Sequence, residues 1–276
     1  MPWFPEQFSA KFLASLQPES NGGAVAAVPY FDGVLSGDIR ALVDSFAGAP
    51  ELHHPTQGRV QGEEAFSRFI SAEGDKLRSA HAVATPVNVV VTPHRAVEEV
   101  VLAFDGVAGR IELPVAVVAD LDRGRINELR VYFSSWPERG AHAVRPPVLQ
   151  SDPAMHLAGV VGEYQRALAQ GSLEAVIRAF EPGATVREPA GREFVHAGAE
   201  ELRALYELFF SNGGGVPLEH CTFTDDGHAC AIEYNVVRWG RTDVPPQAGV
   251  AVYVRGESGR IAHARIYDDV DPPVGR

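Results

Sequence analysis

Hydrophobic residues recur with helical spacing early in each half of the chain. Ser172 is a suitable N-cap for a helix that places Val176, Ile177 and Phe180 on one face, and Asp38 precedes a similar pattern in the first half. Residues spaced by three or four positions lie on the same side of a helix. We therefore predict a short amphipathic helix in each half.

A longer helix is predicted over residues 200–210. Leu202, Leu205 and Tyr206 share one face of that helix, and the three glycines at 213–215 end it.

The later part of each half has the pattern of antiparallel strands. In the second half, the segment 221–239 is interrupted by Asp and Gly at 225–227, and the segment 249–267 is interrupted at 256–259. Such interruptions between hydrophobic runs are typical of β-hairpins. Helices followed by hairpins predict an α+β fold, in which the helices pack on one face of a curved antiparallel sheet and the resulting cone encloses a ligand pocket.

The two halves are copies of one unit. Four residues of the first half reappear 134 positions later without a gap: Tyr30 as Tyr164, Gly37 as Gly171, Phe46 as Phe180 and Pro55 as Pro189. The stretch 124–137, GRINELRVYFSSWP, likewise resembles 259–272, GRIAHARIYDDVDP. Each copy has about 120 residues, which is near the common size of a domain.

The repeat predicts two domains joined by a linker. The stretch 138–153 contains three prolines and no hydrophobic periodicity. The predicted organisation is an N-terminal extension (1–23), a first domain (24–137), a linker (138–152) and a second domain (153–276). Two copies of one surface pair readily about a two-fold axis, so we expect an intramolecular pseudo-dimer, alone or within a further homo-oligomer.

Composition and charge exclude several classes of protein. Of the 276 residues, 45% are hydrophobic and 22% are charged, as in ordinary globular proteins. The net charge of −12 argues against nucleic acid and anionic membranes as partners. The N-terminal stretch has no basic head and no unbroken apolar run, so we expect a cytoplasmic protein. Cys221 and Cys230 lack zinc-site spacing and no dinucleotide fingerprint occurs, so neither a metal nor a cofactor is expected.

Three features together resemble a known family. The sequence TVREPAG at 185–191, Tyr164 upstream of it and the GRI…Y pattern at 259–267 are similar to the ketosteroid isomerase branch of the nuclear transport factor 2-like superfamily. SnoaL-like polyketide cyclases and epoxide-opening hydrolases belong to the same superfamily. The resemblance extends over 24–137 and 153–272, and it implies two cone-shaped α+β domains.

The resemblance implies an acid–base site in the second copy. Glu188 stands where the isomerases keep an Asp general base, and Tyr164 stands where they keep the Tyr that donates a hydrogen bond to the developing enolate. Tyr206 stands where a second Tyr supports the first. Burial in an apolar cone raises the pKa of a carboxyl group, and a Tyr in low dielectric stabilises an oxyanion.

One position departs from the isomerases. Their protonated Asp aligns with Ala251, so a hydrogen-bond donor is missing there. Strand alternation then predicts that Tyr253 faces the pocket as a substitute donor, and that Ile266 and Asp268 face it from the last strand. Asp268 is alternatively a surface charge that, with Asp269, ends the strand.

The same alternation turns Glu233 and Asn235 into the pocket, although a one-residue shift of the hairpin would reverse them. A second acid beside Glu188 would favour epoxide opening or cyclisation over ketone isomerisation. In those reactions one carboxyl group protonates the leaving oxygen while the other removes a proton.

The first copy is altered at the corresponding positions. His54 replaces the acid, Tyr30 keeps the position of Tyr164, and Ile70 replaces Tyr206. A His is a base near neutral pH without any shift, and Glu99 is its expected acidic partner. A structural or ligand-orienting role for His54 is the alternative.

These observations predict a cofactor-independent isomerase or cyclase for a small hydrophobic oxygenated molecule, such as a polyketide, terpenoid or steroid-like ketone or epoxide. The reaction is expected mainly in the second domain. The alternatives are an epoxide hydrolase or epoxide-opening cyclase, and a non-catalytic protein that binds an apolar ligand.

Overall fold

The chain divides into two compact units, one ending at Phe133 and the other beginning at Ser134. The structure is a computed structural model, and it describes residues 30–107, 109–191 and 194–274. The predicted N-terminal extension, 1–23, lies outside the described residues.

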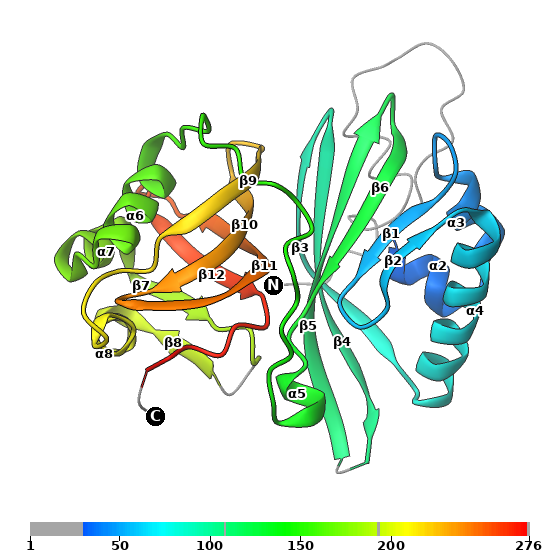
Figure 1. Cartoon of the computed structure of the whole chain (residues 1–276), viewed down its shortest axis with the longest axis horizontal. Coiled ribbons are helices and arrows are strands. Elements are labelled where there is room, and N and C mark those ends of the chain that lie inside the picture. The colour runs from blue at the N-terminus through cyan, green and yellow to red at the C-terminus, as the bar shows by residue number, and fades with distance from the viewer. Residues whose placement is uncertain (1–29, 108, 192–193, 275–276) are drawn as a thin grey trace. The chain divides into compact units, whose positions relative to one another are not determined.

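The first unit has a six-stranded sheet with helices on one side (Figure 1). Its sheet has the strand order β2-β1-β6-β5-β4-β3, and all neighbours are antiparallel except β1 and β6. The elements are α2 (Tyr30–Ser36), α3 (Ile39–Asp44), β1 (Glu51–His54), β2 (Gly58–Gln61), α4 (Glu63–Ser79), β3 (Val83–Thr92), β4 (Arg95–Gly106), β5 (Gly109–Asp122) and β6 (Arg125–Tyr132).

The second unit repeats this arrangement, with α6, α7 and α8 on one side of its sheet (Figure 1). Its strand order is β8-β7-β12-β11-β10-β9. The elements are α5 (Trp136–Arg139), α6 (Gly159–Gln170), α7 (Leu173–Ala179), β7 (Phe180–Arg187), β8 (Val195–Ala197), α8 (Gly198–Phe210), β9 (Leu218–Asp225), β10 (Ala229–Trp239), β11 (Thr242–Arg255) and β12 (Ile261–Tyr267).

The matching strand orders confirm the predicted fold class, which is α+β in each of two repeated units. The sheets differ from the prediction in one respect, because each contains one parallel pair, β1 with β6 and β7 with β12. Parallel neighbours require a long connection, and the intervening helix and strands provide it in both units.

The short helices begin close to where the pattern predicted. The Asp38 side chain accepts a hydrogen bond from the Ala41 backbone N–H at 3.0 Å, which caps α3. Ser172 occupies the N-cap of α7 without a side-chain hydrogen bond. Phe180, predicted on the face of that helix, is instead the first residue of β7, because its backbone is extended with φ −96° and ψ 152°.

Each unit has its own hydrophobic core between the helices and the sheet. In the second unit, Tyr164 of α6 and Tyr206 of α8 pack with Ile232 and Tyr234 of β10. Residues 230, 232, 234 and 236 all belong to this core, so the even positions of β10 face the helices.

The segment predicted as a linker is hydrogen-bonded to the second unit. The Arg145 carbonyl accepts from the Ala248 N–H at 3.0 Å, and the Leu149 carbonyl accepts from Asn235 Nδ2 at 3.0 Å. Side chains of this segment are therefore available to the site of that unit.

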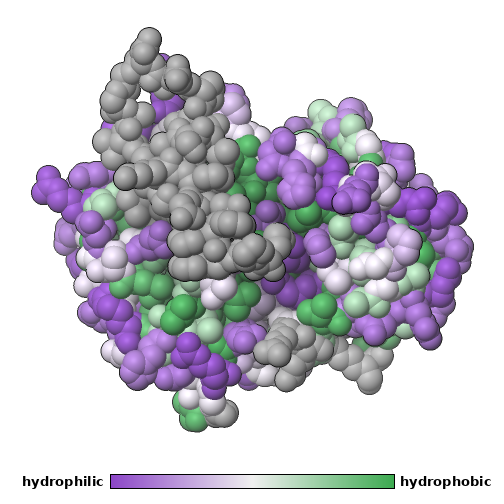
Figure 2. All heavy atoms as spheres, turned by 180° about the vertical axis from the view of Figure 1, so that it is seen from behind, coloured by the Kyte–Doolittle hydropathy of each residue, from purple (hydrophilic) through white to green (hydrophobic). Residues whose placement is uncertain are grey.

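No helix in the described ranges is long and apolar enough to cross a bilayer. Figure 2 shows mainly hydrophilic residues on the face that it draws, with hydrophobic residues in smaller groups between them.

Candidate functional site

A pocket lies inside the second unit between its helices and its sheet. Its apolar lining includes residues of helices, strands and loops, among them Leu168, Val186, Phe209, Val216, Trp239 and Ile266. Seven polar or titratable side chains share this lining: His142, Tyr164, Glu188, Tyr206, Tyr234, Tyr253 and Asp268. An apolar pocket with a few placed polar groups is typical of a small-molecule site.

The two helix tyrosines form a pair at this pocket. The hydroxyl oxygens of Tyr164 and Tyr206 are 2.8 Å apart, and both side chains are buried. Burial raises the pKa of Tyr164 to about 12, and burial beside Tyr164 raises the pKa of Tyr206 well above its usual value. Both phenols therefore stay neutral near pH 7. One hydroxyl donates to the other, which leaves one proton of the pair to donate to a ligand oxygen.

Glu188 lies directly after the end of β7. Its Oε1 is 2.9 Å from His196 Nε2, and its side chain is 14% exposed. The Glu188 backbone N–H donates to the Phe194 carbonyl at 3.0 Å. The carboxyl group lines the pocket.

Asp268 contributes a second carboxyl group to the same pocket. The Tyr234 hydroxyl donates to Asp268 Oδ2 at 2.8 Å, and the Val270 N–H donates to Oδ1 at 3.3 Å. Burial raises the pKa of Asp268 to about 6, although these two hydrogen bonds oppose the rise. The alternative prediction of a surface charge is wrong for Asp268, which is 9% exposed.

Tyr253 is held by a chain of hydrogen bonds at the pocket. Gln165 Nε2 donates to the Tyr253 hydroxyl at 2.8 Å, and Gln165 Oε1 is 3.2 Å from His220 Nε2. Burial lowers the pKa of His220, which favours the neutral ring as a donor to the amide. The structure thus places Tyr253 on the pocket lining together with Ile266.

Glu233 and Asn235 lie on the other face of the sheet. They are the odd positions of β10, whereas Tyr234 and Val236 line the pocket. Glu233 accepts a hydrogen bond from the Thr222 hydroxyl at 2.6 Å. The prediction that Glu233 and Asn235 point into the pocket is wrong. It relied on an alignment of this hairpin that is off by one residue, and a shift of one residue assigns every side chain of a strand to the opposite face of the sheet.

The first-copy candidates His54, Tyr30 and Ile70 are all buried within their own unit. His54 is buried, with Thr56 Oγ1 3.2 Å from its Nδ1 and the rings of Phe69 and Phe133 against it. Tyr30 is buried, and burial raises the pKa of its hydroxyl. Ile70 is a core residue, as expected for an apolar replacement of Tyr206.

Glu99 also faces away from the core of its unit. Val100 and Leu102 belong to that core, so the even positions of β4 face the helices. Glu99 instead accepts a hydrogen bond from Asn88 Nδ2 at 2.9 Å. The predicted inward orientation of Glu99, and with it the acid–base pair with His54, is wrong for the same one-residue reason as for Glu233.

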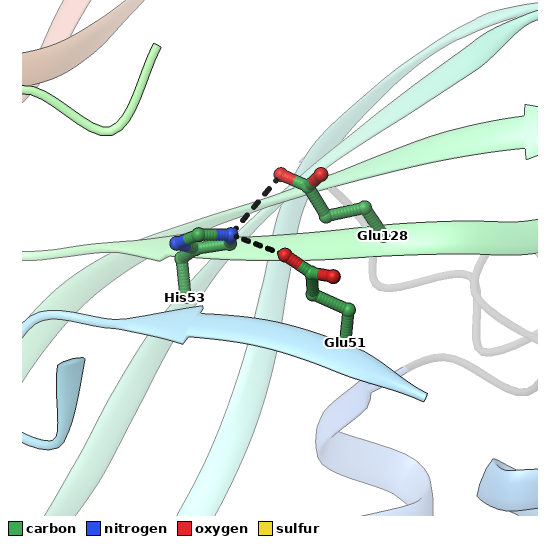
Figure 3. A group of neighbouring side chains, drawn as sticks. All are labelled: Glu51, His53 and Glu128. Atoms are coloured by element: carbon green, nitrogen blue, oxygen red, sulfur yellow. Dashed lines mark hydrogen bonds and ion pairs between the residues drawn. The ribbon is translucent and has the colours of Figure 1, made fainter. Parts of the chain in front are cut away.

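One group in the first unit has the geometry of possible metal ligands. Figure 3 shows His53 with its Nε2 directed at Glu51 and Glu128, at 3.1 and 3.5 Å. Arg59 binds both oxygens of Glu51, at 2.7 and 3.0 Å, and Arg130 lies 2.9 Å from Glu128. The guanidinium groups already balance both carboxylates, so this group is best described as an ion-pair network.

Two of the polar residues that line the pocket were not predicted from the sequence, Tyr234 and His142. His142 lies in the segment predicted as a linker, and its Nδ1 is 2.9 Å from Oδ1 of Asp269. The two residues are 127 positions apart, so no local pattern links them.

A family model matches part of the second unit. Residues 161–264 match a family model described as a SnoaL-like domain, which confirms the predicted resemblance for this copy. No curated protein matches the chain.

Several solved structures are similar in fold. The epoxide hydrolase/cyclase-like enzyme SalBIII, described for pyran ring formation in the polyether salinomycin, is 22% identical over 40% of this chain and 87% of its own, with a TM-score of 0.35. An NTF2-like protein of unknown function from Cytophaga hutchinsonii is 18% identical over 40% and 87%, with a TM-score of 0.33. Another from Burkholderia xenovorans is 21% identical over 42% and 84%, with a TM-score of 0.33.

Proposed function

We propose that the SnoaL-like domain at residues 161–264, completed by its flanking segments, is an acid–base enzyme that opens an epoxide in a small hydrophobic molecule, as a cyclase or a hydrolase. The observation that carries the proposal is that two carboxyl groups in different surroundings, Glu188 and Asp268, line one apolar pocket. A carboxyl group that burial keeps protonated can serve as the acid of a reaction in which a second carboxyl group serves as the base.

The two groups take complementary roles. A nucleophilic hydroxyl, from water or from the substrate, loses its proton to Glu188 as its oxygen bonds to an epoxide carbon. The C–O bond of the epoxide breaks, and the released oxygen takes the proton of the Asp268 carboxyl group. Burial keeps a protonated fraction of Asp268 available near pH 6, whereas an ordinary Asp would be ionised there. Exchange of protons with solvent restores both groups.

A second candidate is isomerisation or aldol-type cyclisation of a ketone. The observation that favours it is the Tyr164–Tyr206 pair, whose neutral phenols suit a developing enolate oxygen. In that reaction Glu188 alone moves the proton between carbon atoms, and Asp268 is not required as an acid.

The experiment supplies cyclohexene oxide and 1,2-epoxyoctane in ¹⁸O-labelled water, with a β,γ-unsaturated cyclohexenone in parallel, and follows products by mass spectrometry. Epoxide opening by the wild-type protein is expected, and Asp268→Asn is expected to lose about 10²–10⁴-fold in rate, the usual contribution of a placed acid or base. Glu233→Gln is the matched control, because it changes a buried carboxyl group on the other sheet face.

The outcomes separate the alternatives. Conversion of the enone but of neither epoxide would favour the ketone reaction. Binding of these compounds without any conversion would favour a non-catalytic binding protein and contradict the proposal.

A further inference from the structure

His142 and Asp269 form a hydrogen-bonded pair at the edge of the pocket. Asp269 Oδ1 lies 2.9 Å from His142 Nδ1 and also accepts from the Ser134 hydroxyl at 2.7 Å. Its Oδ2 accepts from the backbone N–H groups of Ser135 and Ala143, at 3.0 and 2.9 Å. The carboxylate is therefore fixed by donors on both oxygens.

The surroundings of Asp269 determine which nitrogen of the imidazole carries the proton. Burial acts to raise the pKa of Asp269, but the hydrogen bonds from His142, Ser135 and Ser134 lower it overall. An ionised carboxylate only accepts hydrogen bonds, so Nδ1 of His142 must be the protonated nitrogen. In the neutral ring, Nε2 is then a hydrogen-bond acceptor.

Nε2 has no hydrogen-bond partner among the described residues, although it is buried. The His142 side chain is 8% exposed and lines the pocket. The ring of Trp136 packs against the imidazole with centroids 4.9 Å apart, which opposes rotation of the ring. Buried polar atoms are nearly always paired in folded proteins, so an unpaired one at a pocket indicates a ligand group.

We propose that Nε2 of His142 accepts a hydrogen bond from a hydroxyl group of the ligand, and that Asp269 positions the ring for this contact. The pocket then selects a hydroxylated hydrophobic molecule over the corresponding ether. This inference deepens the proposed function by naming a feature of the substrate. A hydroxyl group has one proton, so the hydroxyl bound by His142 is a recognition group, distinct from the nucleophilic hydroxyl that loses its proton to Glu188.

The test measures binding, so it does not depend on turnover. The probes are 4-tert-butylphenol and its methyl ether, 4-tert-butylanisole, titrated into the full chain. One hydrogen bond is expected to favour the phenol by roughly fivefold. The variant His142→Phe keeps a ring of similar shape without the acceptor, so it should bind both probes equally. His228→Phe, at an exposed hairpin position, is the matched control and should keep the preference.

A second measurement starts from the free protein. The ¹⁵N imidazole spectrum of the free protein should show His142 with Nδ1 protonated and Nε2 bare, and the Nε2 resonance should move on addition of the phenol but not of the ether. Asp269→Asn should change the tautomer population without removing the ring.

Several results would overturn the inference: a protonated Nε2 in the free protein at neutral pH, equal binding of the two probes by the wild type, or failure to bind the phenol. Its failure is distinguishable from that of the proposed function. If the protein prefers the phenol over the ether but converts no epoxide, only the proposed epoxide opening is contradicted. If it opens an epoxide but binds the phenol and the ether equally, only the proposed role of His142 is contradicted.

Discussion

Glu188 and Asp268 carry the same functional group in different surroundings. Glu188 has an imidazole at 2.9 Å, whereas Asp268 is buried against a phenol. Burial stabilises the neutral form of Asp268, which suits this group to supply a proton and leaves the role of base to Glu188.

At the level of this residue, Glu188→Gln is expected to lower turnover by about 10²–10⁴-fold, because the amide keeps the shape but cannot accept a proton. Ligand affinity and folding should change little. His54→Gln, at the matching position of the first copy, should have a smaller effect on the same reaction. Steady-state kinetics of both variants decide the point, and abolition of turnover by His54→Gln alone would move the reaction to the first copy.

Asp268 should also make the free energy of unfolding depend on pH. Its pKa is raised from 3.8 to about 6, so the folded state binds this proton more tightly than the unfolded state. Stability from this group is therefore present at low pH and is lost as pH rises from about 4 to about 6.

The loss is on the order of 3 kcal/mol in the free energy of unfolding, from a pKa rise from 3.8 to about 6. Asp268→Asn removes the titrating group, so its stability relative to the wild type should increase across this range. Urea unfolding of both proteins at a series of pH values measures the difference in their free energies of unfolding. The contributions of the other titrating groups are common to both proteins and cancel in this difference. A difference that stays constant with pH would contradict the burial of an ionisable group here.

At the level of elements, the equivalent helices α3 and α7 of the two copies have different N-cap residues. The Asp38 carboxylate accepts from the Ala41 N–H and caps α3, whereas Ser172 at the start of α7 makes no side-chain bond. The backbone N–H groups at a helix start are stabilised by such an acceptor.

Asp38→Ala should therefore lower the free energy of unfolding by about 1 kcal/mol, the usual cost of a lost cap. Ser172→Ala is the matched control at the same helix position and should cost less. Chemical denaturation of both variants gives the comparison. An equal cost for the two substitutions would show that the Asp38 hydrogen bond does not stabilise α3.

The strands show why alternation needs a correct register. The even positions of β10 and β4 face the core, so both glutamates predicted as inward, Glu233 and Glu99, lie on the other face. Side chains of a strand alternate with a period of two, and an error of one position in either hairpin exchanges the two faces completely. The same alternation on β11 and β12 was aligned correctly, and Tyr253 and Ile266 line the pocket.

At the level of the whole molecule, two copies of one fold have kept different residues. Both sheets have the same strand order. Only the second unit combines an acid after its first strand, Glu188 after β7, with a tyrosine in the following long helix, Tyr206 in α8. The pairing of the two copies as an intramolecular pseudo-dimer stays a prediction from the repeat, which an experimental structure of the whole chain would test.

The resemblance to the ketosteroid isomerase branch made Glu188, Tyr164 and Tyr206 candidates, whereas the sequence by itself determined the repeat and the order of helices and hairpins. The repeat and the order of elements depend on spacing within a few residues or on a constant offset between the copies, and such patterns can be recognised in the sequence without knowledge of long-range contacts. The tertiary structure decided which acids share the pocket, since the burial of Asp268 results from packing of the chain end against β10 and β11. It also decided the pairing of His142 with Asp269, 127 residues away, because contacts at that separation arise only when the folded backbone brings the two segments together.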